Sequence, residues 1–448
     1  MTICAFTAAA ENGNAWAARP GCVITAEGSY AARLARHGES WYPERWTLGG
    51  PEPYAVPLPG HQPEEPGTEV QPMTDGRVLV HRAMGGRHTF SLLYPTGPGT
   101  GELALGAVEC PGAGSRLRLL PPSPTGNRAY ALAVDGDTTT VWLVAGGAHG
   151  PERLARVPAR CGGGVWLDRA GRMLALDRVP EGGPTKTVVV DLARGGEVSP
   201  LLEITEESDD RVLLADWDSG LLLIRSDAPS PGHARLGWGV LGSTLPVRFP
   251  ECLRLGSASV TPFAIQPGQM LTPESCAVAL RIDGAAGSWV GVWRPAHRTV
   301  QHLAPPAGWL AGAGLWTPEG VLRLPYATEA VRCGVARLAV PGGTVPPVKE
   351  PSARPGPDSG ERGAARPVPL QQAPLWERTA SGAAKVRRPL AEPARRTPAA
   401  AVRNPPTEAA LRTPSEPVHK PPAEAAGTPP AEVTKTSPAG NAPVMAAR

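Results

Sequence analysis

Long apolar runs are missing from this 448-residue sequence, and so is the commonest serine-hydrolase motif. No stretch of about 18 apolar residues occurs, which argues against a membrane-spanning helix. No G-x-S-x-G is present, so we do not expect a serine hydrolase built on that nucleophile turn. The first ten residues carry no Lys or Arg, and Glu11, Asn12 and Asn14 follow before signal-peptide length is reached. We therefore expect a cytoplasmic, monomeric protein.

Cysteine and histidine are sparse and follow no ligand pattern. The seven cysteines are widely spaced and include no C-x-x-C, so neither a zinc site nor a disulfide framework is expected. The nine histidines lack the i, i+2 spacing that places two ligands on one strand face. The closest pairs are His81 with His88 and His297 with His302, which we interpret as core or surface residues. The sequence thus predicts no catalytic residue, no metal site and no cofactor.

Charge is low and unevenly distributed. The net charge is +3 overall, with −3 over residues 1–344 and +6 over residues 345–448. Neither value approaches the dense positive patch by which a protein neutralises nucleic-acid phosphates. A nucleic-acid partner is therefore not expected.

What the sequence does contain is a repeat: a turn built on Gly or Ser, followed directly by a short apolar run. It occurs at Gly28, Gly76, Gly126, Gly171, Gly220, Ser275 and Gly320. The successive spacings are 48, 50, 45, 49, 55 and 45 residues, which is the size of a four-stranded propeller blade. Gly and Pro together make up 107 residues, which suits short strands joined by turns. The sequence predicts an all-β fold: one β-propeller of about seven four-stranded blades from Cys22 to Val340, with six as the second choice.

The third repeat shows the blade pattern most clearly. Two apolar runs, Arg128 to Val134 and Thr140 to Ala145, are joined across Asp135-Gly136. Asp-Gly between two such runs is a strong hairpin signal. The runs are almost continuously apolar, as expected for strands that are covered by a neighbouring blade on each face.

Two repeats resemble the PD40, or TolB-type, propeller module, which has a Ser-Pro-Asp-Gly turn and a later strand ending near Asp. Here Ser123-Pro124-Thr125-Gly126 stands at the turn, and Asp168 to Gly171 takes that place in the next blade. The resemblance implies the propeller fold and no functional residue, since the Asp of the turn is Thr125. WD40 repeats fit less well, because the one Trp-Asp dipeptide, Trp217-Asp218, precedes a strand. Kelch repeats fit less well too.

A change of composition marks a second region. Residues 345–448 contain 21 prolines and one aromatic residue, Trp376. Such a segment buries too little apolar surface to offset the entropy of ordering its backbone. We expect a propeller over residues 1–344 and a disordered tail over residues 345–448. An open ring would expose two sheet edges, so we expect Thr2 to Thr7 to pair as the outer strand of the last blade.

Two acidic motifs are interpreted as solvated loops. Asp216-x-Asp218-x-Gly220 begins like a calcium loop, but its third position is Gly and its closing glutamate is missing. The run Glu206 to Asp210 reads as a solvated loop, although on a propeller face it could attract a basic partner.

Function is predicted only in outline. The leading hypothesis is a non-catalytic propeller scaffold that binds a protein partner through one face. The alternative is a small-molecule or sugar-binding propeller with weak hydrolase or lyase activity. Candidate partner-binding aromatic residues are Trp41, Tyr42 and Trp46 in the first repeat and Trp376 in the tail, because clustered aromatics can anchor a partner. Blade-to-blade packing also needs large side chains, and it is the preferred explanation for the first three.

Overall fold

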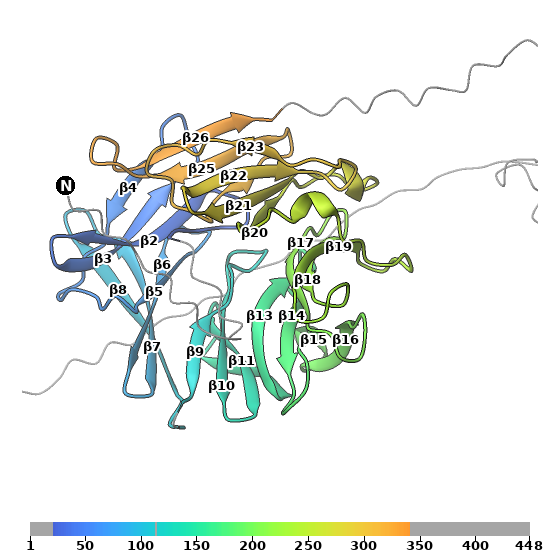
Figure 1. Ribbon diagram of the computed structural model, residues 1–448. Coiled ribbons are helices and arrows are strands. Elements are labelled where there is room, and N and C mark those ends of the chain that lie inside the picture. Colours follow the sequence, from blue (N-terminus) through green and yellow to red (C-terminus); the bar gives the residue numbers. More distant parts are fainter. Residues whose placement is uncertain (1–20, 113, 341–448) are drawn as a thin grey trace, which may run out of the picture. The chain divides into compact units, whose positions relative to one another are not determined.

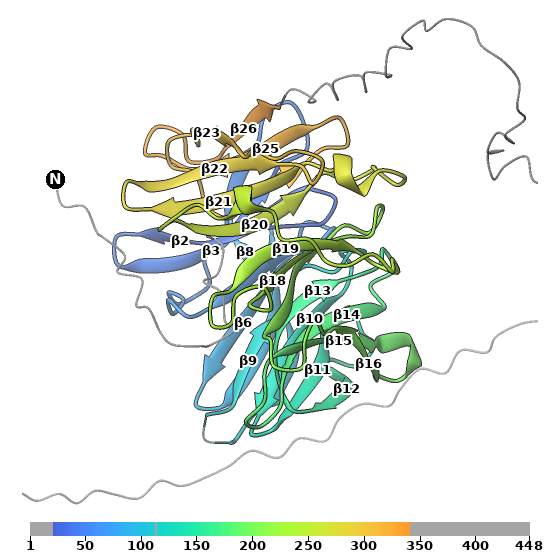
Figure 2. The same ribbon diagram turned by 45° about the vertical axis from the view of Figure 1, so that its right-hand side comes forward.

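The computed structural model describes residues 21–112 and 114–340. Across these ranges, 26 strands form seven separate antiparallel sheets, and within each sheet the strands follow chain order. The sheets succeed one another around a ring, as Figures 1 and 2 show from two sides. This is a seven-bladed β-propeller. The prediction of one propeller with about seven blades from Cys22 to Val340 is therefore confirmed.

Five blades have four strands and two have three within the described residues. Blades 1 and 2 comprise β1 (Val23–Ile24), β2 (Tyr30–His37), β3 (Ser40–Thr47), β4 (Tyr54–Pro57), β5 (Glu69–Pro72), β6 (Val78–Met84), β7 (Arg87–Pro95) and β8 (Thr100–Glu109). Blades 3 and 4 comprise β9 (Arg116–Leu119), β10 (Ala129–Asp135), β11 (Thr138–Ala145), β12 (Glu152–Pro158), β13 (Arg160–Trp166), β14 (Met173–Val179), β15 (Lys186–Asp191) and β16 (Glu197–Leu202). Blades 5 to 7 comprise β17 (Asp210–Ala215), β18 (Leu221–Ser226), β19 (Arg235–Val240), β20 (Ser259–Ile265), β21 (Val278–Gly284), β22 (Gly287–Trp293), β23 (Gln301–Leu303), β24 (Leu315–Trp316), β25 (Val321–Tyr326) and β26 (Gly334–Ala339).

Helices are minor in the described residues. Three single-turn 3₁₀ helices occur in loops: η1 (Leu192–Arg194), η2 (Glu251–Leu253) and η3 (Pro273–Ser275). Within residues 21–112 and 114–340, no helix is long and apolar enough to cross a membrane.

The repeat marks in the sequence lie at the turn between the first and second strands of each blade, here called the first turn. In six blades the mark is a glycine with φ between +65° and +82°. The amide of that glycine donates to a carbonyl three or four residues earlier, as Gly126 N does to Ser123 O at 2.9 Å. Only glycine adopts this left-handed conformation at little cost. Blade 6 carries Ser275 instead, at the end of a longer loop.

First turns of adjacent blades touch one another around the ring. Thr74 N of blade 2 donates to Gly126 O of blade 3 at 3.1 Å. A Cβ placed on Gly126 would lie 2.1 Å from Thr74 Cγ2. Likewise, a Cβ on Gly28 would lie 2.3 Å from Leu315 Cδ2 of blade 7. Glycine is thus required for its conformation and also for the close approach of neighbouring blades.

Blade 7 packs directly against blade 1. Cys22, Ala31 and Trp46 of blade 1 share a buried apolar cluster with Ala313, which precedes β24. In Figures 1 and 2, β25 and β26 accordingly lie beside blade 1. The predicted closing strand, Thr2 to Thr7, and the tail over residues 345–448 lie outside the described residues.

The core consists of apolar layers between blades. Side chains alternate between the two faces of a strand, so each strand contributes to two layers. On β6, Val78 and Val80 pack toward Ala32 of blade 1, whereas Leu79 packs with Leu117 of blade 3. Strands covered on both faces need apolar residues at every position. This explains the continuous apolar runs in the sequence.

The acidic run Glu206 to Asp210, which connects blades 4 and 5, is partly buried. Its interpretation as a solvated loop is therefore wrong at Asp210. That side chain is fully buried. It accepts hydrogen bonds from Lys186 Nζ at 2.9 Å, Ser226 Oγ at 2.6 Å and Ile204 N at 2.9 Å. Burial alone would raise the pKa of Asp210, but these donors outweigh it and lower the pKa. Asp210 therefore joins blades 4 and 5 as an ionised group.

We expect Gly126→Ala to destabilise the protein more than Gly136→Ala. Both glycines are left-handed, at φ +66° and +56°, so each alanine costs about 1–2 kcal/mol. Nothing lies within 4 Å of a Cβ at Gly136, whereas at Gly126 it meets Thr74. Overpacking should add roughly 1 kcal/mol or more for Gly126→Ala. Guanidinium unfolding of both variants measures the difference, and equal losses would show that the close approach carries no stability.

Asp177 should make stability pH-dependent. It is 4% exposed and accepts a hydrogen bond from Thr187 Oγ1 at 3.1 Å. Burial, opposed by Arg211, raises its pKa to about 6. A raised carboxyl pKa favours folding below the unfolded value near 4, and this advantage is lost as pH rises through 6. When the pH is raised from 4 to 7.5, the free energy of unfolding of Asp177→Asn should increase relative to that of the wild type by about 1–3 kcal/mol. Asp137→Asn, at an exposed hairpin, is the control. If the free energy of unfolding of Asp177→Asn followed that of the wild type at every pH, the raised pKa of Asp177 would be wrong.

Candidate functional site

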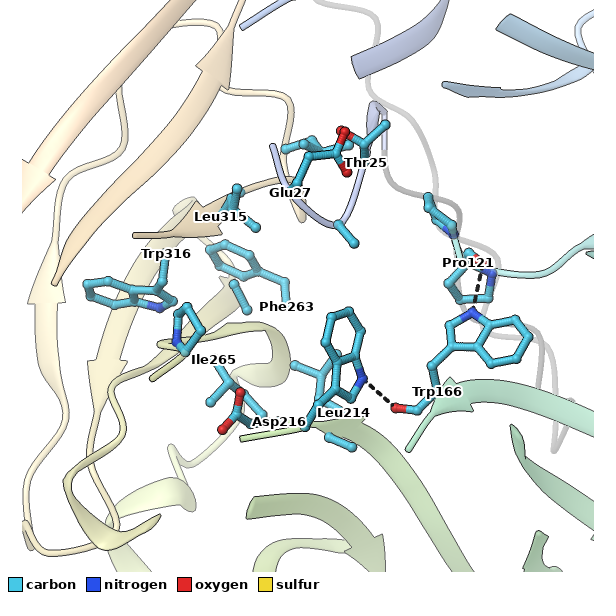
Figure 3. A pocket seen from close by; sticks show the side chains of 18 of the residues that line it. Thr25, Glu27, Pro121, Trp166, Leu214, Asp216, Phe263, Ile265, Leu315 and Trp316 are labelled. Carbon is cyan, nitrogen blue, oxygen red and sulfur yellow. Dashed lines mark hydrogen bonds between the residues drawn. The ribbon is translucent and has the colours of Figure 1, made fainter. Parts of the chain in front are cut away.

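An apolar cavity of about 790 Å³ lies at the ends of the first strands, on the face that carries the first turns. Figure 3 shows its labelled residues arranged around an open space. Blades 1, 3, 4, 5, 6 and 7 contribute to its wall. The side chains discussed below are Ala26, Glu27, Trp166, Arg169, Leu214, Asp216, Trp217, Asp218, Phe263, Ile265, Leu315, Trp316, Glu319 and Arg323.

Two indoles in the wall are held in place by hydrogen bonds that cross from blade to blade. Trp217 Nε1 of blade 5 donates to Trp166 O of blade 4 at 2.9 Å. Trp166 Nε1 in turn donates to Pro121 O of blade 3 at 3.1 Å, and Figure 3 draws both bonds. A ring whose N–H is satisfied can present its apolar surface at little cost. This part of the wall is therefore preformed.

The blade 5 turn also joins blades together. Asp218 Oδ1 accepts Arg169 Nε of blade 4 at 2.8 Å, and its Oδ2 accepts Gly268 N of blade 6 at 2.9 Å. Asp216 Oδ2 accepts both the amide and the hydroxyl of Ser219, at 2.8 and 2.6 Å. The interpretation of this motif as a blade turn is confirmed. It is not solvated, however, because Asp216 is only 9% exposed.

Blade 7 supplies polar donors that lack an acceptor. Arg323 Nε is buried without a hydrogen-bond partner among the described residues, and Arg323 is one of the residues that line the cavity. Trp316 Nε1 is likewise buried without a hydrogen-bond partner among the described residues. Leu315 and Arg323 are paired across β24 and β25, so they share a face that Trp316 does not. A buried donor without an acceptor is costly.

The wall suits binding of apolar groups. Leu214, Phe263, Ile265 and the indole of Trp217 offer hydrocarbon and aromatic surface. Within residues 21–112 and 114–340, no group of three or more His, Cys, Asp or Glu side chains is placed to hold a metal ion.

The predicted aromatic cluster of blade 1 is divided between two faces of β3. Trp41 faces one side, and Tyr42 and Trp46 face the other. Trp46 is fully buried, donates Nε1 to Glu44 Oε2 at 2.7 Å, and has Arg33 over its ring at 5.1 Å. It therefore packs between blades, while Trp41 and Tyr42 are half-buried. Trp376 lies outside the described residues.

A buried Glu–His–His chain in blade 2 was not identified from the sequence. His81 Nδ1 lies 2.6 Å from Glu69 Oε2, and His81 Nε2 lies 2.9 Å from His88 Nδ1. Leu119 N of blade 3 also donates to Glu69 Oε2, at 3.0 Å. Burial, together with His81, lowers the pKa of His88. The sequence signal is the hairpin between β6 and β7, whose register brings two histidines seven residues apart into contact.

No protein-family model and no curated protein matches this chain. Solved structures that it resembles include TolB from Acinetobacter baumannii, at 14% identity and a TM-score of 0.34, covering 51% of this chain and 55% of that one. Oligogalacturonate lyase from Vibrio parahaemolyticus is 11% identical with a TM-score of 0.45, covering 70% and 87%. Prolyl oligopeptidase B from Galerina marginata is 12% identical with a TM-score of 0.43, covering 70% and 45%. Likeness at these identities concerns the fold alone.

Proposed function

We propose that this protein is a non-catalytic binding propeller, and that an apolar segment of a partner protein enters the axial cavity. The observation that carries the proposal is the preformed apolar wall of the cavity, about 790 Å³ in volume. Pockets of this size hold drug-sized ligands or a few peptide side chains. Because Trp166 and Trp217 are already fixed by hydrogen bonds, a ligand loses little free energy in ordering them.

A peptide fits the polar features of the wall as well as the apolar ones. Arg323 lines the cavity with a guanidinium group that donates hydrogen bonds, and every peptide unit supplies a carbonyl oxygen. The carboxylates of Asp216 and Asp218 are engaged by donors of the protein itself. We therefore assign these two groups to holding the turns, and not to acid–base chemistry.

The second candidate is a sugar or other small molecule, with weak hydrolase or lyase activity. The partly exposed indole of Trp217 favours it, because sugars stack on aromatic faces. Under this hypothesis the same cavity is used, but the ligand is not a peptide.

We expect Ala26→Trp to abolish partner binding without unfolding the protein. Ala26 lies in the first turn of blade 1 and lines the cavity, so an indole there occupies the space of the ligand. Random 12-residue peptides are displayed and selected on the wild-type full-length chain alone, and the affinity of the retained peptides for Ala26→Trp is measured afterwards. The peptides retained should bind the wild type at least tenfold more tightly than the variant.

Ala148→Trp is the matched control, since Ala148 is exposed in the loop between β11 and β12 at the same end of the propeller. It should bind the selected peptides as the wild type does. Thermal unfolding of both variants establishes that they fold. Selected peptides that bind Ala26→Trp equally well, or a selection that retains no peptide, would contradict peptide binding in the cavity. Stabilisation by oligosaccharides that is lost in Ala26→Trp would favour the second candidate.

A further inference from the structure

One first turn is far longer than the others. In blade 6, residues 266–277 connect Ile265 to Val278, whereas four to nine residues suffice in the other blades. This insertion accounts for the longest repeat spacing, the 55 residues between Gly220 and Ser275. We call residues 266–277 the blade 6 loop.

The base of the blade 6 loop is tied to both neighbouring blades. Gly268 N donates to Asp218 Oδ2 of blade 5 at 2.9 Å, and Gln266 Nε2 donates to Pro318 O of blade 7 at 3.0 Å. Pro267 and Gly268 themselves line the axial cavity. The position of the loop at the cavity is therefore set by hydrogen bonds within the ring.

The tip of the blade 6 loop exposes two large apolar side chains. Met270 is 69% exposed and Leu271 is 94% exposed, only two and three residues beyond Gly268. Isolated apolar residues on a surface need no explanation, but Met270 and Leu271 follow closely on Pro267 and Gly268, which line the apolar cavity. Long loops on a rigid scaffold are also where binding residues concentrate.

The first turns carry a net negative charge. The segments between first and second strands contain seven carboxylates and four arginines. The carboxylates are Glu27, Asp75, Asp168, Asp216, Asp218, Glu274 and Glu319, and the arginines are Arg77, Arg128, Arg169 and Arg172. Arg77 pairs with Asp75 and Arg169 pairs with Asp218. Glu27 and Glu319 remain exposed among the residues that line the cavity. A ligand with basic groups is thus favoured at the mouth.

We propose that the segment bound in the cavity is an apolar peptide with basic flanks, and that Met270 and Leu271 of the blade 6 loop cover its apolar part. This inference rests on the proposed function. The apolar residues of the peptide enter the cavity, a peptide carbonyl accepts from Arg323, and the Lys or Arg side chains of the peptide lie near Glu27 and Glu319.

The test uses the peptides selected on the full-length chain. They should be enriched in Lys and Arg next to an apolar core, and fluorescence anisotropy should show binding that weakens at least fivefold between 0.05 and 0.5 M NaCl. Met270→Ser/Leu271→Ser should weaken binding at least fivefold, and Glu27→Gln/Glu319→Gln at least threefold. Leu245→Ser is the control, because Leu245 is 64% exposed in a different loop and should leave binding unchanged.

Failure of this inference is distinguishable from failure of the proposed function. Selected peptides with acidic or neutral flanks, or peptides that bind Met270→Ser/Leu271→Ser as they bind the wild type, would overturn the inference. The proposed function would still stand if those peptides fail to bind Ala26→Trp. A selection that retains no peptide would overturn both.

Discussion

The close approach of one first turn to the next is the constraint on which this structure depends. At three first turns a left-handed glycine leaves little or no room for a Cβ beside the neighbouring blade: Gly28 against Leu315, Gly76 against Tyr30 and Gly126 against Thr74. Contacts between neighbouring blades bring the first strands together around one axis, and the cavity is the space left between their ends.

The same turns both hold the ring together and form the wall of the cavity. Asp218 links blades 4, 5 and 6, while the indoles of Trp217 and Trp166 link blades 3, 4 and 5. The rigidity of the ring and the shape of the cavity therefore depend on the same hydrogen bonds. The blade 6 loop differs from the other first turns. Its base is fixed as theirs are, but its tip exposes Met270 and Leu271, which bury little surface within the ring. This contrast is the basis for proposing the loop as a binding element.

The architecture could be predicted from the sequence because it is local and repeated. Gly in a left-handed turn followed by an apolar run is visible residue by residue, and its spacing gives the number of blades. The cavity could not be predicted in this way, because its wall combines residues from six blades that are up to 300 positions apart in the chain. The His81–His88 contact was missed since strand pairing, not sequence spacing, brings the rings together. Trp46 shows that closeness in sequence can also mislead. Trp41, Tyr42 and Trp46 look like one cluster in the sequence, but strand alternation divides them between two faces and Trp46 is buried.

Hydrogen–deuterium exchange of the full-length chain, with and without a selected peptide, tests the central claim most directly. If the peptide occupies the axial cavity, protection should rise in the segments that line it: residues 22–27, 164–169, 213–218, 263–268 and 312–319. The outer strands β4, β8, β12 and β16 should exchange as before. Protection confined to those outer strands, with the cavity segments unchanged, would contradict the account.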